Sequence, residues 1–114
     1  MLNLRRIGAE AEDRAADYLV DRGYTIVTRR WSTRGGELDL VALDGDVLVF
    51  IEVKARSGRR LLPEEAITDQ KIQRFLAAVQ AYCVETDQLD RPVRYDVVAI
   101  DREGVRHYRD AFRA

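Results

Sequence analysis

The amino-acid sequence predicts an α/β fold in which helices flank a mixed central sheet, formed as one domain over residues 1–114. Three observations predict this fold. Two stretches carry apolar residues at helical spacing, several shorter stretches are rich in β-branched and aromatic residues, and the order of these stretches is helix, three strands, helix, strand. A chain of 114 residues suits a single domain of this class.

The first helix is expected over residues 8–22, because apolar side chains recur there every three or four positions and form one stripe. Gly23 should end this helix, since glycine adopts the left-handed backbone conformation at little cost. Tyr24 would then fold back onto Leu19. Residues 24–28 are β-branched and aromatic, so they predict the first strand.

Two further strands are expected over residues 37–43 and 47–54. The segment between them, Asp44-Gly45-Asp46, is a strong hairpin signal. Residues 47–51 are apolar at every position instead of alternating with polar ones. A strand of this kind is covered on both faces, so it should be central in the sheet.

The second helix should begin near Thr68, whose hydroxyl group can cap it, while Asp69 suits the positive end of the helix dipole. A fourth strand is expected over residues 94–101. A short fifth strand over residues 105–108 would follow a turn at Glu103-Gly104. These last two strands complete the predicted mixed sheet.

Charged side chains interrupt the apolar central strand at its end. Glu52 and Lys54 are two residues apart, so they share one face of that strand. If the hairpin loop has an even number of residues, Asp39 falls on the same face as Glu52, directly opposite it or one pair away. A loop of odd length would put the two carboxylates on opposite faces of the sheet.

Two carboxylates and an ammonium group on an otherwise apolar sheet need a reason, because buried charges are costly unless they are paired or bind a metal. Adjacent carboxylates repel each other, and oxygen ligands suit Mg²⁺ or Mn²⁺. Such a metal binds a phosphate oxygen and lowers the pKa of a bound water, which a lysine can orient or deprotonate. Asp39, Glu52 and Lys54 therefore predict phosphodiester hydrolysis. The alternative is a buried ion pair without a metal.

Two sequence motifs carry a family resemblance. Residues 36–42 (GELDLVA) and 49–56 (VFIEVKAR) resemble the signature of the YraN family of bacterial proteins. That family is similar to the restriction-endonuclease-like PD-(D/E)xK superfamily and to archaeal Holliday-junction resolvases. Leu38 stands where the name of the superfamily has proline, a position that varies among its members. Further matches in the expected order are Gly8 to Glu12, Gly23-Tyr24, Arg30-Trp31 and the helix that carries Lys71.

The resemblance implies an αβββαβ core of the restriction-endonuclease-like kind. It implies that Asp39 and Glu52 are ligands of Mg²⁺ or Mn²⁺ and that Lys54 is the catalytic lysine. Glu12 matches the first-helix glutamate that completes such sites in the resolvases, although from the sequence alone it is an ordinary helical acid. The implied function is a nuclease acting on DNA, including branched or structured DNA. The alternative is a non-catalytic nucleic-acid-binding module that retains the fold.

Basic residues cluster locally, although the net charge of the chain is only −1. Arg30 and Arg34 lie in one cluster without acids, and Arg56 lies in a second cluster that follows the third strand. These clusters suit phosphate contacts, and the alternative is a solvated surface. The resemblance adds Lys71, on the first turn of the second helix, as a further phosphate contact. We therefore expect these four side chains to face nucleic acid.

Three other residues help to place the protein. Trp31 follows two arginines and is interpreted as a packing residue at a strand edge, with base stacking as the alternative. His107 is the only histidine and is interpreted as structural. Cys83 is the only cysteine, which excludes an internal disulfide and favours a cytoplasmic location. The longest apolar run, residues 47–51, is too short to span a bilayer, so no membrane insertion is expected. Nucleases of this size commonly cut both strands as dimers, so a homodimer is also expected, without an identified interface.

Overall fold

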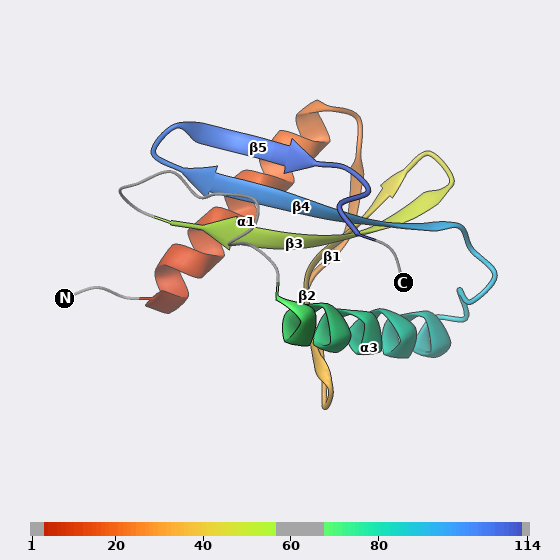
Figure 1. Ribbon diagram of the computed structural model, residues 1–114. Coiled ribbons are helices and arrows are strands. Elements are labelled where there is room, and N and C mark those ends of the chain that lie inside the picture. The colour runs from red at the N-terminus through yellow and green to blue at the C-terminus, as the bar shows by residue number, and fades with distance from the viewer. Residues whose placement is uncertain (1–3, 57–67, 113–114) are drawn as a thin grey trace.

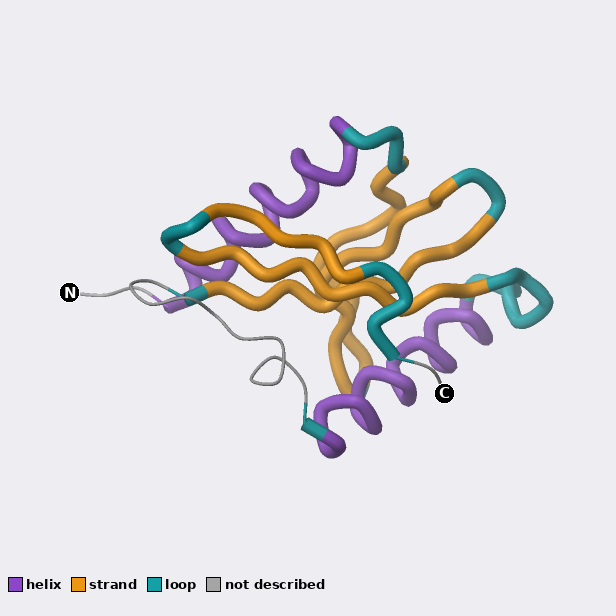
Figure 2. The backbone as a smooth tube through the Cα atoms, turned by 45° about the horizontal axis from the view of Figure 1, so that its top comes forward, coloured by secondary structure: helices purple, strands orange, loops and turns teal. Residues whose placement is uncertain are grey.

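Figure 1 shows the computed structural model, which describes residues 4–56 and 68–112. Five strands form one mixed sheet in the order β1-β2-β3-β4-β5, in which only the β3–β4 pair is parallel. Helix α1 packs on one face of this sheet and helix α3 on the other (Figures 1 and 2). The elements are α1 (Leu4–Asp21), β1 (Thr25–Thr33), β2 (Gly36–Asp44), β3 (Val47–Ala55), α3 (Asp69–Glu85), β4 (Val93–Asp101) and β5 (Gly104–Tyr108). The predicted α/β fold is confirmed.

Helix α1 ends as the sequence predicts, although it begins earlier, at Leu4. Gly23 has a φ angle of 92°, and its N–H donates to the carbonyl oxygen of Val20 at 3.0 Å. The N–H of Tyr24 donates to the carbonyl oxygen of Leu19 at 3.0 Å, which completes a Schellman motif. Tyr24 and Leu19 are both buried in the same hydrophobic cluster, so the predicted fold-back is confirmed.

Strand β3 is central in the sheet, as its continuous apolar run predicts. Val49 and Ile51 are fully buried in the cluster under α1, whereas Phe50 is fully buried in the cluster under α3. Successive residues of a strand point to opposite faces, so a strand between two helical layers needs apolar residues at every position. The β2–β3 turn fixes the register, because Asp44 pairs with Val47 across it.

Strand β1 is longer than predicted. The sequence places its end at Thr28, but the strand runs to Thr33 and stays paired with β2. Over residues 31–38, which we call the ribbon, β1 and β2 pair with each other while β2 no longer pairs with β3. The ring of Trp31 packs edge-on against Tyr82 of α3, with centroids 5.4 Å apart, so Trp31 is a packing residue. The ribbon therefore leaves the sheet and crosses α3 (Figure 1).

Helix α3 begins with the predicted cap. The Thr68 hydroxyl accepts a hydrogen bond from the N–H of Lys71 at 3.2 Å, and Asp69 lies in the first turn. The helix covers its face of the sheet with one apolar stripe. That stripe is Phe75, Ala78, Val79, Tyr82 and Cys83. Cys83 is buried within this stripe.

A buried polar network holds the start of β4, strand β5 and the C-terminal turn together. Asp96 is fully buried, and its carboxylate contacts Arg94 at 2.9 Å and His107 at 2.7 Å. Burial by itself raises the pKa of Asp96, but hydrogen bonds from His107, Arg94 and the N–H of Asp110 hold that pKa at about 2. His107 is thus part of this buried network, which agrees with the structural role predicted for it from the sequence.

Gly36 is required by close packing, and this requirement can be tested. A Cβ atom at Gly36 would lie 2.6 Å from the carbonyl oxygen of Arg74 in α3, whereas a Cβ at Gly35 would lie 3.8 Å from the Cβ of Ala77. We expect Gly36→Ala to lower the free energy of unfolding by about 1–3 kcal/mol. The backbones of β2 and α3 would have to move apart to make room for the added methyl group. The control, Gly35→Ala, should change it by less than about 0.5 kcal/mol. Urea denaturation measures both, and equal effects would contradict the packing argument.

Candidate metal centre

Asp39 and Glu52 lie on one face of the sheet at the point where β2 leaves β3. The β2–β3 ladder runs from Asp44–Val47 to Leu40–Ile51, and one further step in the same register sets Asp39 opposite Glu52. The two-residue turn thus puts both carboxylates on the same face, as the even-loop argument predicts. This placement is a result of hairpin geometry and requires no long-range contact.

The backbone bends sharply at Asp39. Leu38 and Leu40 are two residues apart, yet Leu38 is buried in the cluster under α3 and Leu40 in the cluster under α1. In a flat strand these side chains would share a face. The β1–β2 pairing skips the opposing Arg30, which has a positive φ angle of 53°. Asp39 therefore occupies the bend between the sheet and the ribbon.

The bend fixes the carboxylate of Asp39 against the main chain of β3. Its Oδ2 accepts a hydrogen bond from the N–H of Val53 at 2.8 Å. The β2–β3 ladder ends at Leu40, so this side chain replaces the backbone partner that a continued strand would supply to Val53. The carboxylate is consequently held by a rigid backbone group.

The same position disfavours the charge of Asp39. Burial is the larger cause and the charge of Glu52 the next, and together they raise the pKa of Asp39 from 3.8 to about 7. The hydrogen bond from Val53 opposes this rise without cancelling it. A divalent cation between the two carboxylates would relieve both the repulsion and the cost of burial. The donor chemistry therefore fits Mg²⁺ or Mn²⁺, with Asp39 and Glu52 as the residues that would hold it.

Two lysines complete the group of charges. Lys54 Nζ lies 3.1 Å from Glu52 Oε1, and both side chains are about one-fifth exposed, at 19% and 23%. Burial alone lowers the pKa of Lys54, but its hydrogen bond with Lys71 and the charge of Glu52 outweigh burial, so the pKa of Lys54 is raised. The same hydrogen bond and the charge of Lys54 lower the pKa of Lys71. The sequence did not predict that Lys71 adjoins Lys54.

Glu12 lies near this group but has another partner. Its charge contributes to the raised pKa of Asp39, which places it within electrostatic reach from α1. Its Oε2 accepts a hydrogen bond from Nε of Arg30, and the Glu12 side chain is only 15% exposed. Within residues 4–56 and 68–112, no three His, Cys, Asp or Glu side chains converge as a ready ligand set. The centre therefore has two carboxylates, with Glu12 held back by Arg30.

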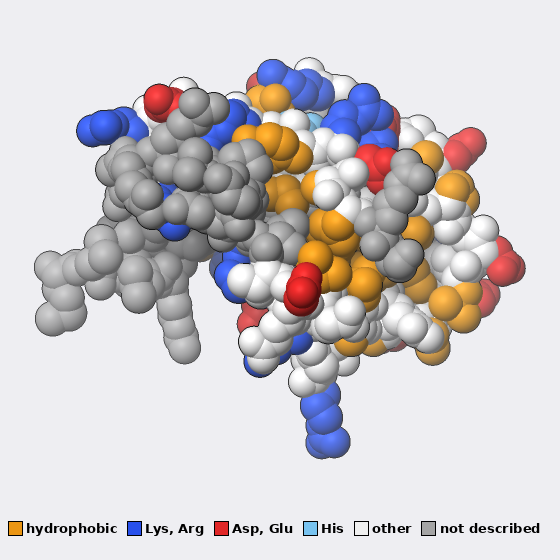
Figure 3. Space-filling view, in the orientation of Figure 1, with side chains coloured by type: hydrophobic (Ala, Val, Ile, Leu, Met, Phe, Trp, Pro, Cys, Tyr) orange, Lys and Arg blue, Asp and Glu red, His pale blue; other side chains and the backbone are white. Residues whose placement is uncertain are grey.

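The four expected phosphate contacts have different surroundings. Arg30 is engaged by Glu12 yet remains 53% exposed, and Arg34 is exposed at the turn of the ribbon. Arg56 follows β3 and is partly buried, with its N–H bound to the carbonyl oxygen of Ile100 at 3.0 Å. Lys71 is exposed on α3. Figure 3 shows blue Lys and Arg side chains at the lower edge of the molecule, where Figure 1 places the turn of the ribbon.

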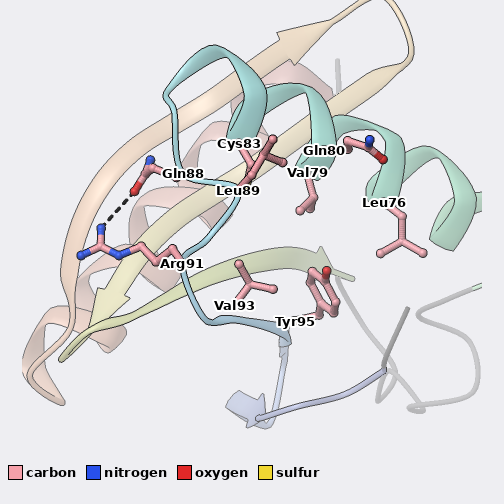
Figure 4. Close-up of a pocket in the computed structure, with 9 residues that line it drawn as sticks. All are labelled: Leu76, Val79, Gln80, Cys83, Gln88, Leu89, Arg91, Val93 and Tyr95. Atoms are coloured by element: carbon pink, nitrogen blue, oxygen red, sulfur yellow. Dashed lines mark hydrogen bonds between the residues drawn. The ribbon is translucent and has the colours of Figure 1, made fainter.

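A hollow of about 250 Å³ lies away from the metal centre, between α3 and the start of β4 (Figure 4). Its rim carries a hydrogen bond of 2.9 Å from Arg91 to Gln88. It is lined by Leu76, Val79, Gln80, Cys83, Gln88, Leu89, Arg91, Val93 and Tyr95. None of the predicted site residues lines it, so it has no part in the centre.

Comparison with known proteins shows the family. Residues 11–100 match the model described as "Uncharacterised protein family UPF0102". The chain belongs to the UPF0102 family. Because the YraN proteins are this family, the resemblance found in the sequence is confirmed.

UPF0102 relatives cover nearly the whole chain. A UPF0102 protein of Phocaeicola vulgatus is 39% identical over 98% of this chain and 96% of its own length. One from Symbiobacterium thermophilum is 43% identical over 85% of this chain and 83% of its own. One from Rhodococcus opacus is 42% identical over 93% of this chain and 95% of its own. Among the described residues, no helix is long and apolar enough to cross a membrane.

The raised pKa of Asp39 predicts a pH dependence of stability in the absence of metal. Between about pH 4 and pH 7 the folded state binds more protons than the unfolded state, so stability should fall as pH rises through that range. Asp39→Asn removes this titration and should raise the free energy of unfolding at pH 8 by about 2 kcal/mol, with chelator present.

Urea denaturation at pH 5 and pH 8 measures this difference. Asp17→Asn, an exposed aspartate on α1, serves as the matched control and should keep the pH dependence of the wild type. Parallel curves for wild type and Asp39→Asn would show that Asp39 does not carry the effect.

Proposed function

We propose that this protein is a Mg²⁺- or Mn²⁺-dependent nuclease that hydrolyses phosphodiester bonds of DNA, including branched or structured DNA. The observation that carries the proposal is the pair of facing carboxylates, Asp39 and Glu52, with Lys54 Nζ at 3.1 Å from Glu52. Membership of the UPF0102 family is consistent with it, and the resemblance to PD-(D/E)xK nucleases supports the reaction class. The fold alone would not suffice, since one fold hosts many functions.

The carboxylates and lysines have separate proposed roles. Asp39 and Glu52 would hold the cation, which, when bound, polarises a phosphoryl oxygen and lowers the pKa of a water. Lys54 has a raised pKa, so it stays protonated at neutral pH and stabilises negative charge that develops on the phosphate. Lys71 is exposed and lies close to Lys54, so it would bind a neighbouring phosphate of the substrate through its positive charge.

Glu12 has a conditional role in this proposal. The resemblance assigns it to the metal site, but its carboxylate is bonded to Arg30. It reaches a cation only when that ion pair opens, or it acts at a distance through its charge. Glu12→Gln should therefore reduce activity less than Asp39→Asn does.

The second candidate is a nucleic-acid-binding module that does not cut. The observation that favours it is the engagement of Glu12 by Arg30, which leaves two carboxylates where a third ligand is expected. Mg²⁺ is often held by one or two carboxylates together with substrate phosphates, so two ligands are sufficient for the nuclease proposal. Contacts of Arg30, Arg34, Arg56 and Lys71 with nucleic acid, and a homodimer, belong to either candidate and stay predictions.

A cleavage assay separates the two candidates. Wild-type protein is incubated with linear, single-stranded and branched DNA and with RNA, in Mg²⁺, Mn²⁺ or chelator. We expect metal-dependent cleavage of DNA, reduced about 100-fold or more by Asp39→Asn, Glu52→Gln or Lys54→Met, because each removes a ligand or a charge used in the transition state. Asp17→Asn should cleave like the wild type.

The assay has clear contrary outcomes. Cleavage that persists in all three site variants would place the activity elsewhere or in a contaminant. Binding without any cleavage by folded wild-type protein would favour the non-catalytic module.

A further inference from the structure

Three exposed cations form a row that starts at the metal centre and crosses α3. The side chain of Lys71 lies close to that of Lys54, the cation beside Glu52. Arg74 follows Lys71 by three positions, so the two side chains are neighbours on the surface of the helix. Both are exposed. The row therefore continues directly from the group of charges at the site.

The third cation comes from the ribbon. The turn of the ribbon is Arg34-Gly35, and the adjoining Gly36 is so close to α3 that an added Cβ would lie 2.6 Å from the carbonyl oxygen of Arg74. Gly35 is close to Ala77, one turn further along the same helix. This packing holds the turn that carries exposed Arg34 against the part of α3 that carries Arg74, although the two residues are 40 positions apart in the sequence.

Arg34 and Arg74 differ from several other arginines among the described residues in forming no ion pair with an acid. Arg30, Arg94 and Arg106 each form an ion pair with an acidic side chain. In the part of the chain that the structure describes, Arg34 and Arg74 form no ion pair with an acid. Both side chains are exposed, so their guanidinium groups are accessible from solvent. Such cations are suited to an external anion.

We propose that Lys71, Arg74 and Arg34, which we call the cationic track, bind successive phosphates of one polynucleotide strand next to the bond that is cut. The inference rests on the proposed nuclease function and adds its substrate-binding surface. The occupant is a sugar–phosphate backbone, because the track consists of cations and adjoins the proposed phosphodiester-cleaving site. Backbone contacts of this kind fix the position of a strand without reading its sequence. Binding should accordingly be independent of sequence and strongly dependent on salt.

Binding is measured without cleavage, so that the track can be tested apart from the reaction. Fluorescence anisotropy follows a labelled 20-nucleotide DNA, as single strand and as duplex, in chelator at several salt concentrations. The double variant Arg34→Gln/Arg74→Gln should bind about tenfold more weakly, with a slope of log K against log[salt] that is smaller by about 1.4–1.8. The matched control is Arg22→Gln/Arg109→Gln, which removes the same charge at the opposite end of the sheet.

The outcomes separate the track from the reaction. Arg22 precedes the start of β1, and Arg109 contacts Asp44 at the end of β2, five residues along that strand from Asp39. The control variant therefore removes positive charge away from Asp39. If both double variants weaken DNA binding equally, the loss of affinity follows from net charge and the proposed track is wrong. The proposal is also wrong if Arg34→Gln/Arg74→Gln does not weaken DNA binding. If the wild type binds DNA through the track but does not cleave it, the nuclease proposal is wrong and the binding proposal still stands. Protein that cuts while binding independently of the track refutes only the track.

Discussion

The register of the β2–β3 hairpin is the constraint on which the rest of the structure depends. Gly45 takes a φ angle of 61° in a two-residue turn, so Asp44 pairs with Val47 and the later pairs follow in order. One step beyond the last pair, Leu40–Ile51, the same register sets Asp39 opposite Glu52. One residue more in the turn would put the two carboxylates on opposite faces of the sheet. A turn at one end of the strands thus decides the chemistry at the other.

One bend in β2 positions both the proposed metal ligand Asp39 and the ribbon that carries part of the proposed cationic track. At Asp39 the strand leaves the sheet, which frees the N–H of Val53 for the carboxylate and buries a charge beside Glu52. Beyond the bend, the ribbon crosses α3, so the turn that carries Arg34 packs against the helix near Arg74. The raised pKa of Asp39 means that its negative charge is expected to lower stability at neutral pH. The bend therefore buries the Asp39 carboxylate beside Glu52 and directs the ribbon across the cationic surface of α3.

Much of the fold could be predicted because its signals are local. Gly23, Thr68 and Asp44-Gly45-Asp46 act through their own backbone, and the parity of the hairpin was enough to place Asp39 and Glu52 on one face. The early end predicted for β1 was wrong, since residues 29–33 lack an apolar strand pattern and are held by contacts with β2 and α3. The contacts of Lys71 with Lys54 and of Glu12 with Arg30 could not be predicted, because periodicity gives a face and not a distant partner.

Calorimetric titration of Mn²⁺ into metal-free protein at pH 8 tests the central claim most directly. The wild type should bind the ion, and both Asp39→Asn and Glu52→Gln should bind it at least about tenfold more weakly, since each loses one of two ligands. Asp39→Asn should do so while remaining folded and more stable than the wild type. Equal Mn²⁺ affinity in the wild type and the two variants, or no binding by folded wild type, would contradict a metal centre at Asp39 and Glu52.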